Sequence, residues 1–277
     1  MRRIIALGTL ALAAVAIAAD QAEAVTFTAT LNTIKISAQP GQVMTRPFEL
    51  TLGADQPRTV FTARAEDWWR SEDNKQSFYA APGRLRRSCG PWMSVNPMEA
   101  AVEPGGTLKV RVTVAVPSEV ESGGYWCALT VDEVPDPASA DGVAVRFLAS
   151  VSVGIFVYID PVERAGEIGD VTISRDEAEI TLHNRGNTPL TVEGRVEFVR
   201  AGAAGASAPV ATVVIPRATV LTEPARTSVL RTALPEAGRL PSGRYLVRAI
   251  LDIGLEHYIG LERELDVRRP NGDEGSR

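Results

Sequence analysis

Two segments about 120 residues apart carry the same motif, in which a turn rich in Pro, Ser and Gly is followed by a Tyr and an alternating strand. In the first segment the turn covers residues 117–124 and precedes Tyr125; in the second, Pro241-Ser242-Gly243-Arg244 precedes Tyr245. A Tyr at this place can bury its ring while its hydroxyl donates to the backbone of the turn, an arrangement called a tyrosine corner. Because each half of the chain has one such motif, two β-sandwich domains in tandem are predicted.

The composition agrees with an all-β chain. It includes 18 Pro and 23 Gly, and 45% of the residues are hydrophobic, which is enough for two cores. The clearest strand pattern lies at residues 107–116, where Leu108, Val110, Val112 and Val114 alternate with polar or charged residues. One face of that strand is expected to lie in the core and the other in solvent.

The order of strands and turns gives an expected organisation of the chain. We expect a first sandwich domain at 25–160, a second at 166–268, and a polar tail at 269–277. Asp160-Pro161-Val162-Glu163 is the expected linker, because the apolar run stops there and charges follow. Within the first domain, residues 25–37 are predicted to form one strand and residues 66–89 an irregular region.

The N-terminus has the features of a secretory signal peptide at residues 1–24. Arg2 and Arg3 precede an apolar run, and Ala22-Glu23-Ala24 offers the small residues that signal peptidase prefers. The alternative is a membrane anchor, but the run is shorter than the roughly 20 apolar residues that span a bilayer. We therefore expect a periplasmic or extracellular protein that does not span a membrane once the signal is cleaved.

The charge of the chain argues against nucleic acid as a partner. Its formal net charge is −5 at pH 7. Binding to nucleic acid depends largely on a basic surface that releases the counterions of the phosphates. The acidic balance gives no such surface.

Cys89 and Cys127 are the two cysteines of the chain. In an exported protein the compartment is oxidising, so a disulfide between them is predicted. The loop that it closes would add about 3 to 4 kcal/mol of stability in the chain-entropy account.

No catalytic machinery is visible in the sequence. His183 and His257 are the two histidines, and neither stands beside a nucleophile motif or a metal ligand at helical spacing. Gly123-Gly124 is not followed by the Lys and Ser or Thr of a phosphate-binding loop. The chain is therefore predicted not to be an enzyme and to hold no metal and no cofactor.

The last strand of the first domain is the first candidate binding element. Residues 143–159 are expected to form an unusually long strand, with Val151 and Val153 in its alternating apolar row. At a sheet edge, such a strand could pair with an extended segment of a partner protein. It could equally be a central strand that is buried on both faces, since long exposed apolar edges promote aggregation.

An aromatic and basic segment is the second candidate. Trp68 and Trp69 are followed by Arg84 and Arg86, and aromatic rings among cations can stack on sugars, peptides or partner side chains. These rings could also simply cover one end of the sandwich, because aromatic side chains are usually buried.

A longer pattern in both halves resembles a known family. Pro91-Trp92-Met93-Ser94-Val95-Asn96-Pro97 is followed by Glu103-Pro104-Gly105-Gly106, by an alternating strand ending at Val116-Pro117, and by Ser122-Gly123-Gly124-Tyr125. The second half contains Asn184-Arg185-Gly186-Asn187-Thr188-Pro189-Leu190 and the second Tyr motif. This order resembles the PapD-like superfamily of periplasmic pilus chaperones and related envelope domains, such as those of WxL-interacting proteins.

The resemblance implies two immunoglobulin-like sandwiches and a protein partner. It implies a chaperone for pilus or surface subunits that binds an extended client segment by strand addition, without catalysis. The family anchors its client with one basic residue on the first strand and one on the last strand of the first domain, and Lys35 and Arg146 lie on those strands here. The alternative is a structural or adhesive envelope module that binds cell-wall glycan, peptidoglycan or another surface protein.

Overall fold

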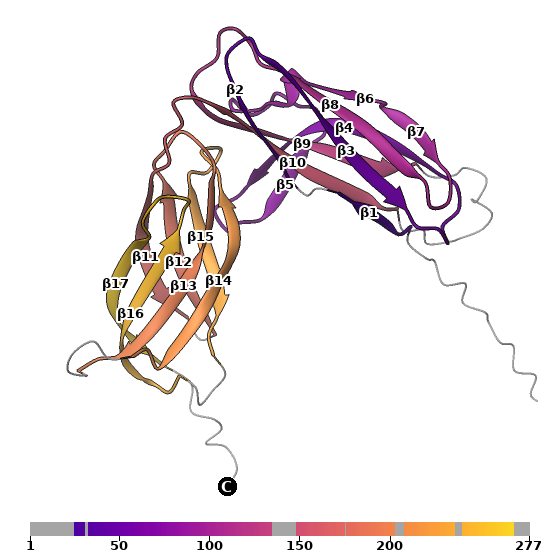
Figure 1. Ribbon diagram of the computed structural model, residues 1–277. Coiled ribbons are helices and arrows are strands. Elements are labelled where there is room, and N and C mark those ends of the chain that lie inside the picture. Colours follow the sequence, from indigo (N-terminus) through magenta and orange to yellow (C-terminus); the bar gives the residue numbers. More distant parts are fainter. Residues whose placement is uncertain are drawn as a thin grey trace, which may run out of the picture.

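The computed structural model describes residues 25–30, 33–134, 148–174, 176–202, 208–235 and 240–268. In these ranges the chain is all-β, with one short 3-10 helix at Gly90–Trp92, and it forms two immunoglobulin-like sandwiches that meet at an angle (Figure 1). The predicted fold class is therefore confirmed. Both the expected signal peptide at 1–24 and the expected tail at 269–277 lie outside the described residues. Within the described ranges, no helix has the length and apolar character that crossing a membrane requires.

The first sandwich packs two sheets against each other. One sheet has the strand order β1-β3-β8-β6 and the other the order β2-β10-β9-β4-β5, with β7 paired to β4. The strands are β1 (Phe27–Ala29), β2 (Thr33–Ala38), β3 (Val43–Leu52), β4 (Thr59–Arg70), β5 (Gln76–Tyr79), β6 (Met93–Asn96), β7 (Glu99–Val102), β8 (Thr107–Ala115), β9 (Gly123–Glu133) and β10 (Ser150–Ile159).

The second sandwich has a three-stranded and a four-stranded sheet, in the orders β11-β12-β15 and β14-β13-β16-β17. Its strands are β11 (Gly166–Ile173), β12 (Glu177–Asn184), β13 (Leu190–Arg200), β14 (Ala211–Val220), β15 (Thr227–Ala233), β16 (Gly243–Asp252) and β17 (Ile259–Val267). Residues 160–165 connect the last strand of the first sandwich to the first strand of the second.

Both tyrosine corners are present. The Tyr125 hydroxyl donates to the Glu121 carbonyl at 2.9 Å, and the Tyr245 hydroxyl donates to the Pro241 carbonyl at 2.7 Å. Each Tyr ring lies in the core of its own sandwich. The motif of a turn followed by Tyr therefore has the same structural role in both halves.

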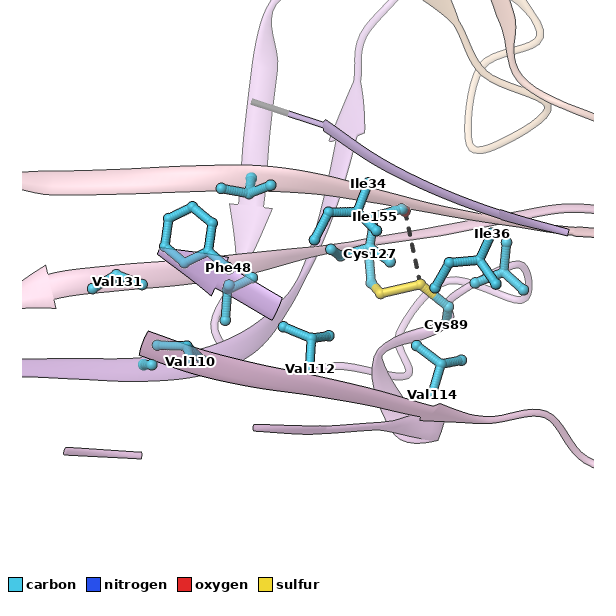
Figure 2. Packing of buried hydrophobic residues seen from close by; sticks show 14 of the residues in the cluster. Ile34, Ile36, Phe48, Cys89, Val110, Val112, Val114, Cys127, Val131 and Ile155 are labelled. Carbon is cyan, nitrogen blue, oxygen red and sulfur yellow. Dashed lines mark hydrogen bonds between the residues drawn. A yellow bond between two sulfur atoms is a disulfide. The ribbon is translucent and has the colours of Figure 1, made fainter. Parts of the chain in front are cut away.

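The alternating strand and the cysteine pair meet in the first core. Leu108, Val110, Val112 and Val114 on β8 are at most 5% exposed, as their spacing predicts. Cys89 and Cys127 are joined in a disulfide that lies beside these valines, as Figure 2 shows. The predicted pairing is therefore confirmed, and it ties the segment before the 3-10 helix to the central strand β9.

Two expectations about strands are wrong. Residues 25–37 form two strands in opposite sheets, because β1 pairs with β3 whereas β2 pairs with β10. Residues 66–89 are only partly irregular, since β4 continues to Arg70 and pairs with β5 to form a hairpin. Trp68, one of the aromatic residues of this region, is buried by packing across the domain junction, which the period-two pattern does not record.

Candidate functional site

Within the described residues, β2 pairs with only part of β10. β2 pairs in parallel with β10 from Gly154 to Ile159, whereas β9 pairs with β10 along its whole length. Over residues 150–153, β10 therefore has one strand partner within the described residues. β1, which precedes β2 in the chain, is paired with β3 on the other side of the sandwich.

The backbone groups that face this opening can be assigned from one hydrogen bond. The Glu133 amide donates to the Ala149 carbonyl at 2.9 Å, so this pair is hydrogen-bonded. Pairs in an antiparallel ladder alternate between hydrogen-bonded and non-bonded, so Val151 and Val153 direct their backbone groups toward β9. The backbone N–H and C=O groups of Ser150 and Ser152 consequently point to the open edge.

The side chains of this stretch point to opposite faces. Val153 is 0% exposed and belongs to the core of the first sandwich, and Val151 is partly buried against that core. Neither valine side chain projects freely from the strand, so neither is placed to enter a groove of a client protein. Ser150 and Ser152 are exposed on the outer face, where their hydroxyls contact Asp132 and Thr130 at 2.6 and 3.0 Å. Binding here would therefore involve the backbone of the serines first.

Lys35 and Arg146 are the two basic residues that the resemblance implies as anchors for a client. Lys35 is exposed on β2, and its position in the ladder is opposite Phe156 of β10. Lys35 therefore lies on the outer face of the sheet, beside the aromatic residues that approach the second sandwich. Arg146 lies outside the described residues, so the pairing of these two cations stays a prediction.

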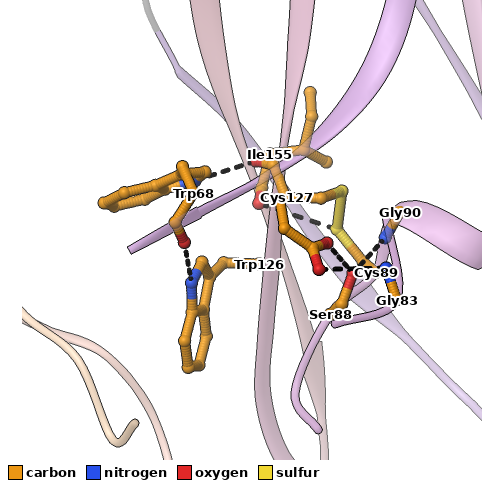
Figure 3. Close-up of a disulfide and its surroundings, with 9 residues drawn as sticks. Trp68, Gly83, Ser88, Cys89, Gly90, Trp126, Cys127 and Ile155 are labelled. Atoms are coloured by element: carbon orange, nitrogen blue, oxygen red, sulfur yellow. Dashed lines mark hydrogen bonds between the residues drawn. A yellow bond between two sulfur atoms is a disulfide. The ribbon is translucent and has the colours of Figure 1, made fainter. Parts of the chain in front are cut away.

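An aromatic cluster fills the junction between the sandwiches. Trp68, Trp126, Ala128 and Phe156 come from neighbouring strands of the first sandwich, and Leu221 comes from the second; all are at most 9% exposed. The ring centroids of Trp68 and Phe156 lie 5.8 Å apart in an edge-to-face arrangement. Trp68 donates its indole N–H to the Cys127 carbonyl at 3.0 Å, and Trp126 donates to the Trp68 carbonyl at 2.8 Å (Figure 3). Of the two interpretations of Trp68, a binding surface or a ring that covers one end of the sandwich, its burial at the junction agrees with the second.

The other members of the aromatic and basic segment lie nearer the surface. Trp69 is partly buried and stacks on Tyr79 of β5, with ring centroids 6.1 Å apart. Arg84 lies over the same Tyr79 ring at 5.3 Å. Arg86 is exposed and pairs with Glu121 at 3.1 Å. These side chains are thus arranged mainly by contacts within the chain.

Asp67 organises the loop that carries the arginines. Its Oδ2 accepts hydrogen bonds from the backbone amides of Gly83, Arg84 and Leu85 at 2.9, 2.7 and 3.1 Å, and its Oδ1 contacts the Ser88 hydroxyl. Figure 3 shows Gly83, Ser88 and Gly90 gathered beside the disulfide. The carboxylate is fully buried and its hydrogen bonds compensate for its desolvation. Asp67 was not among the candidate residues, because its place between Glu66 and Trp68 gives no signal of this role.

Gly123 and Gly124 have a function that the sequence analysis also missed. The Gly124 amide donates to the Asn187 carbonyl of the second sandwich at 2.9 Å. A Cβ on Gly124 would lie 2.6 Å from Pro189 Cδ and 3.0 Å from Thr188 Cα. Gly123 has φ +116, a conformation that favours glycine. The pair of glycines therefore lets the turn at residues 187–189 approach β9 closely.

The β4–β5 hairpin makes a further contact with the second sandwich. The Val229 amide of β15 donates to the Glu72 carbonyl in the hairpin turn at 2.7 Å. Glu223 adds a link elsewhere in the junction, because its carboxylate accepts from the Arg87 amide at 2.5 Å. The two sandwiches are thus joined by apolar, backbone and charged contacts.

Tyr158 is a titratable group that packs at the junction. Burial raises the pKa of Tyr158 above its usual value, although Arg164, whose Cζ lies 5.7 Å from the ring centroid, acts in the opposite direction. Among the described residues, no group of three or more His, Cys, Asp and Glu side chains is arranged to hold a metal ion. His183 shares a 2.8 Å hydrogen bond with Thr227, which is a structural contact between β12 and β15.

Comparison with known proteins gives matches among solved structures. No family model matches the chain, and no curated protein matches it. The E. coli chaperone DraB matches 88% of this chain and 100% of its own, with 14% identity and a TM-score of 0.45. The CupB2 chaperone of Pseudomonas aeruginosa matches 87% and 100%, with 14% identity and a TM-score of 0.44. The YadV chaperone matches 87% and 99%, with 11% identity and a TM-score of 0.47.

All three matched structures are described as chaperones. At such identities and scores they concern the fold and decide nothing about binding. Any function for this chain has to be argued from its own residues.

Proposed function

We propose that this chain is an exported, non-enzymatic binding protein that captures an extended segment of a client protein by strand addition. The observation that carries the proposal is the pairing of β10, which has β9 on one side along its length and, among the described residues, β2 on the other side only from Gly154. An extended segment could continue the sheet from that point, with its backbone bonded to Ser150 and Ser152. Strand addition gains affinity from main-chain hydrogen bonds and specificity from alternate side chains.

The side chains along this edge suit a client segment in which apolar and polar residues alternate. Side chains of the client that point inward would lie beside Val151 and Val153 at the margin of the core, where apolar groups are favoured. Side chains that point outward would lie beside Ser150 and Ser152, which suits polar groups. Lys35, together with Arg146, would supply positive charge for an acidic group of the client.

The client is proposed to be a pilus or surface subunit, and the compartment the periplasm or the cell exterior. The leader-like residues 1–24 and the disulfide between Cys89 and Cys127 support an exported protein. The edge would be occupied when the client is bound, which would also limit unwanted association through an open strand.

A single substitution tests the mode of binding. In Ser152→Pro, the amide that faces the open edge is removed, while the backbone bonds from Val151 and Val153 to β9 remain. The matched control is Ser152→Ala, which keeps that amide. Tagged proteins are purified from the native envelope and the bound subunit is identified and quantified. We expect client recovery with the wild type and Ser152→Ala and its loss with Ser152→Pro; equal recovery with all three would refute strand addition at this edge.

A second candidate function is an envelope module that binds glycan. The observation in its favour is the stack of Trp69 on Tyr79, both partly exposed, with Arg84 over the Tyr79 ring. Such rings could stack on sugars. Binding of cell-wall glycan that is lost in Tyr79→Ala and unchanged in Ser152→Pro would favour this module over the chaperone.

A further inference from the structure

A charged cavity lies between the two sandwiches, away from the open edge of β10. Its volume is about 280 Å³, and it is lined by residues of both sandwiches: Arg86, Arg87, Asn187, Thr222, Glu223 and Arg226. The first two belong to the loop that Asp67 and the disulfide hold in place. The wall is therefore supported from the first sandwich by a buried carboxylate and a covalent bond.

The arginines of the cavity differ in how far their donors are used. The Arg87 side chain is 10% exposed, and its guanidinium N–H groups already donate to the Ser122 carbonyl at 2.7 Å and to the Glu121 carboxylate at 3.1 Å. Arg86 pairs with the same Glu121, but both side chains of that pair are more than 60% exposed. Such exposed pairs are weak and are screened by salt. Arg86 can therefore turn part of its guanidinium toward a ligand at little cost.

Arg226 approaches the cavity from the second sandwich. One of its terminal nitrogens donates to the Gly186 carbonyl at 2.6 Å, which fixes the side chain. A guanidinium has five N–H donors, so this bond leaves most of them for other partners. The side-chain amide of Asn187 already has partners. Its Nδ2 donates to the Pro161 carbonyl, and its Oδ1 accepts from the backbone amide of Glu163.

The charge of the cavity is positive although the chain is acidic. Three arginines line it, and the carboxylates near them are Glu223 in the wall and Glu121 on the outside, so three positive charges less two negative ones leave one. The whole chain has a formal net charge of −5. Between low-dielectric walls, such a local excess attracts small anions more strongly than it would on an open surface.

We propose that this cavity binds a small oxyanion group, held by Arg86 from the first sandwich and Arg226 from the second. Guanidinium groups recognise carboxylate and phosphate oxygens through paired, charge-assisted hydrogen bonds. An oxyanion between them would contact both sandwiches and so stabilise their junction. Glu223 in the wall opposes binding and keeps the affinity modest. The same chemistry could come from free inorganic phosphate or from a carboxylate, and the experiment distinguishes them.

The test measures binding to the full mature chain with two probes. Sodium phosphate and sodium acetate are titrated separately at constant ionic strength, with sodium chloride as the reference, while backbone amide shifts are followed by NMR. The proposal predicts that phosphate causes saturable changes in the amide chemical shifts of residues 186–187 and 222–226. These changes should be larger than those that chloride causes. Shifts with phosphate alone identify an inorganic oxyanion, whereas shifts with both probes identify a site that also accepts carboxylates.

Three variants make the result specific. Arg86→Gln should weaken phosphate binding roughly tenfold, since a hydrogen bond to a charged group is lost. Arg84→Gln is the matched control, because this arginine lies on the same loop, over Tyr79, and does not line the cavity; its affinity should stay unchanged. Glu223→Gln should bind phosphate more tightly, because a carboxylate is removed from the wall. Shifts no larger than those with chloride, or equal affinity of Arg84→Gln and Arg86→Gln, would overturn the proposal.

Discussion

Replacing Gly124 with Ala would place a methyl group where the second sandwich meets β9. The new Cβ would lie 2.6 Å from Pro189 Cδ and 3.0 Å from Thr188 Cα, and it would also meet Thr188 Oγ1. A backbone atom and a proline ring cannot move aside by changing rotamer. The turn at residues 187–189 must therefore withdraw from β9 and lose the 2.9 Å bond between the Gly124 amide and the Asn187 carbonyl.

The cost follows from these two changes. Overpacking of a closely packed site costs about 1 to 3 kcal/mol, and loss of a hydrogen bond about 0.5 to 1.5 kcal/mol, so a loss of about 2 to 4 kcal/mol in the free energy of unfolding is expected. Urea denaturation measures it. Small-angle X-ray scattering should show a larger radius of gyration, because the junction opens while each sandwich keeps its core.

Gly260→Ala is the matched control for this prediction. A Cβ on Gly260 meets the Ala249 carbonyl at 3.4 Å, which is an ordinary contact, and Gly260 lies on β17 rather than at the junction. Its stability and scattering should stay close to those of the wild type. If Gly124→Ala behaved in the same way as Gly260→Ala, the close approach of the two sandwiches at β9 would be refuted.

Three further predictions concern the first sandwich. Val153→Thr should lower the free energy of unfolding by about 1 to 3 kcal/mol in urea denaturation, because it buries a hydroxyl in an apolar core; Val151→Thr, which is only partly buried, should cost less, and equal costs would contradict the burial of Val153. Thiol titration of the denatured, unreduced protein should find no free thiol, and Cys89→Ser with Cys127→Ser should lose about 3 to 4 kcal/mol; two reactive thiols would disprove the bridge. Burial raises the pKa of Tyr125, so the stability that this group contributes is complete below its unfolded pKa of about 10 and is lost as the pH rises through the higher folded value. Tyr125→Phe should remove that alkaline loss and cost about 1 kcal/mol at pH 7 through its bond to Glu121, and an unchanged alkaline profile would count against this assignment.

The parts of the fold that sequence reasoning found are those with a local cause. Tyr125 and Tyr245 bond to carbonyls four residues earlier, so the motif contains both partners. The alternation from Leu108 to Val114 records the two faces of one strand directly. The disulfide followed from the presence of two cysteines in a chain with an export-like leader.

The parts that were missed depend on residues distant in sequence. Burial of Trp68 was one of two interpretations, but its contact with the cluster that includes Leu221 of the second sandwich has no signal in the residues near Trp68. The division of residues 25–37 into β1 and β2 depends on which sheet accepts each piece. Gly124 was read as part of a turn, whereas its need for glycine comes from the turn of the second sandwich that packs on it.

The sequence identified the strand of the candidate site but not the backbone groups that would bind. The long alternating row identified β10, but it could not tell which side of the strand lacks a partner. That answer comes from the register with β2, which places the opening beside Ser150 and Ser152 rather than at the valine side chains.

Amide hydrogen exchange at β10 tests strand addition most directly. The amides of Val151 and Val153 face β9 and should be protected both in the free protein and in its complex with the client purified from the envelope. The Ser152 amide should exchange rapidly in the free protein and become protected in the complex. A Ser152 amide that is already protected in the free protein, or that stays unprotected with the client bound, would contradict binding at this edge.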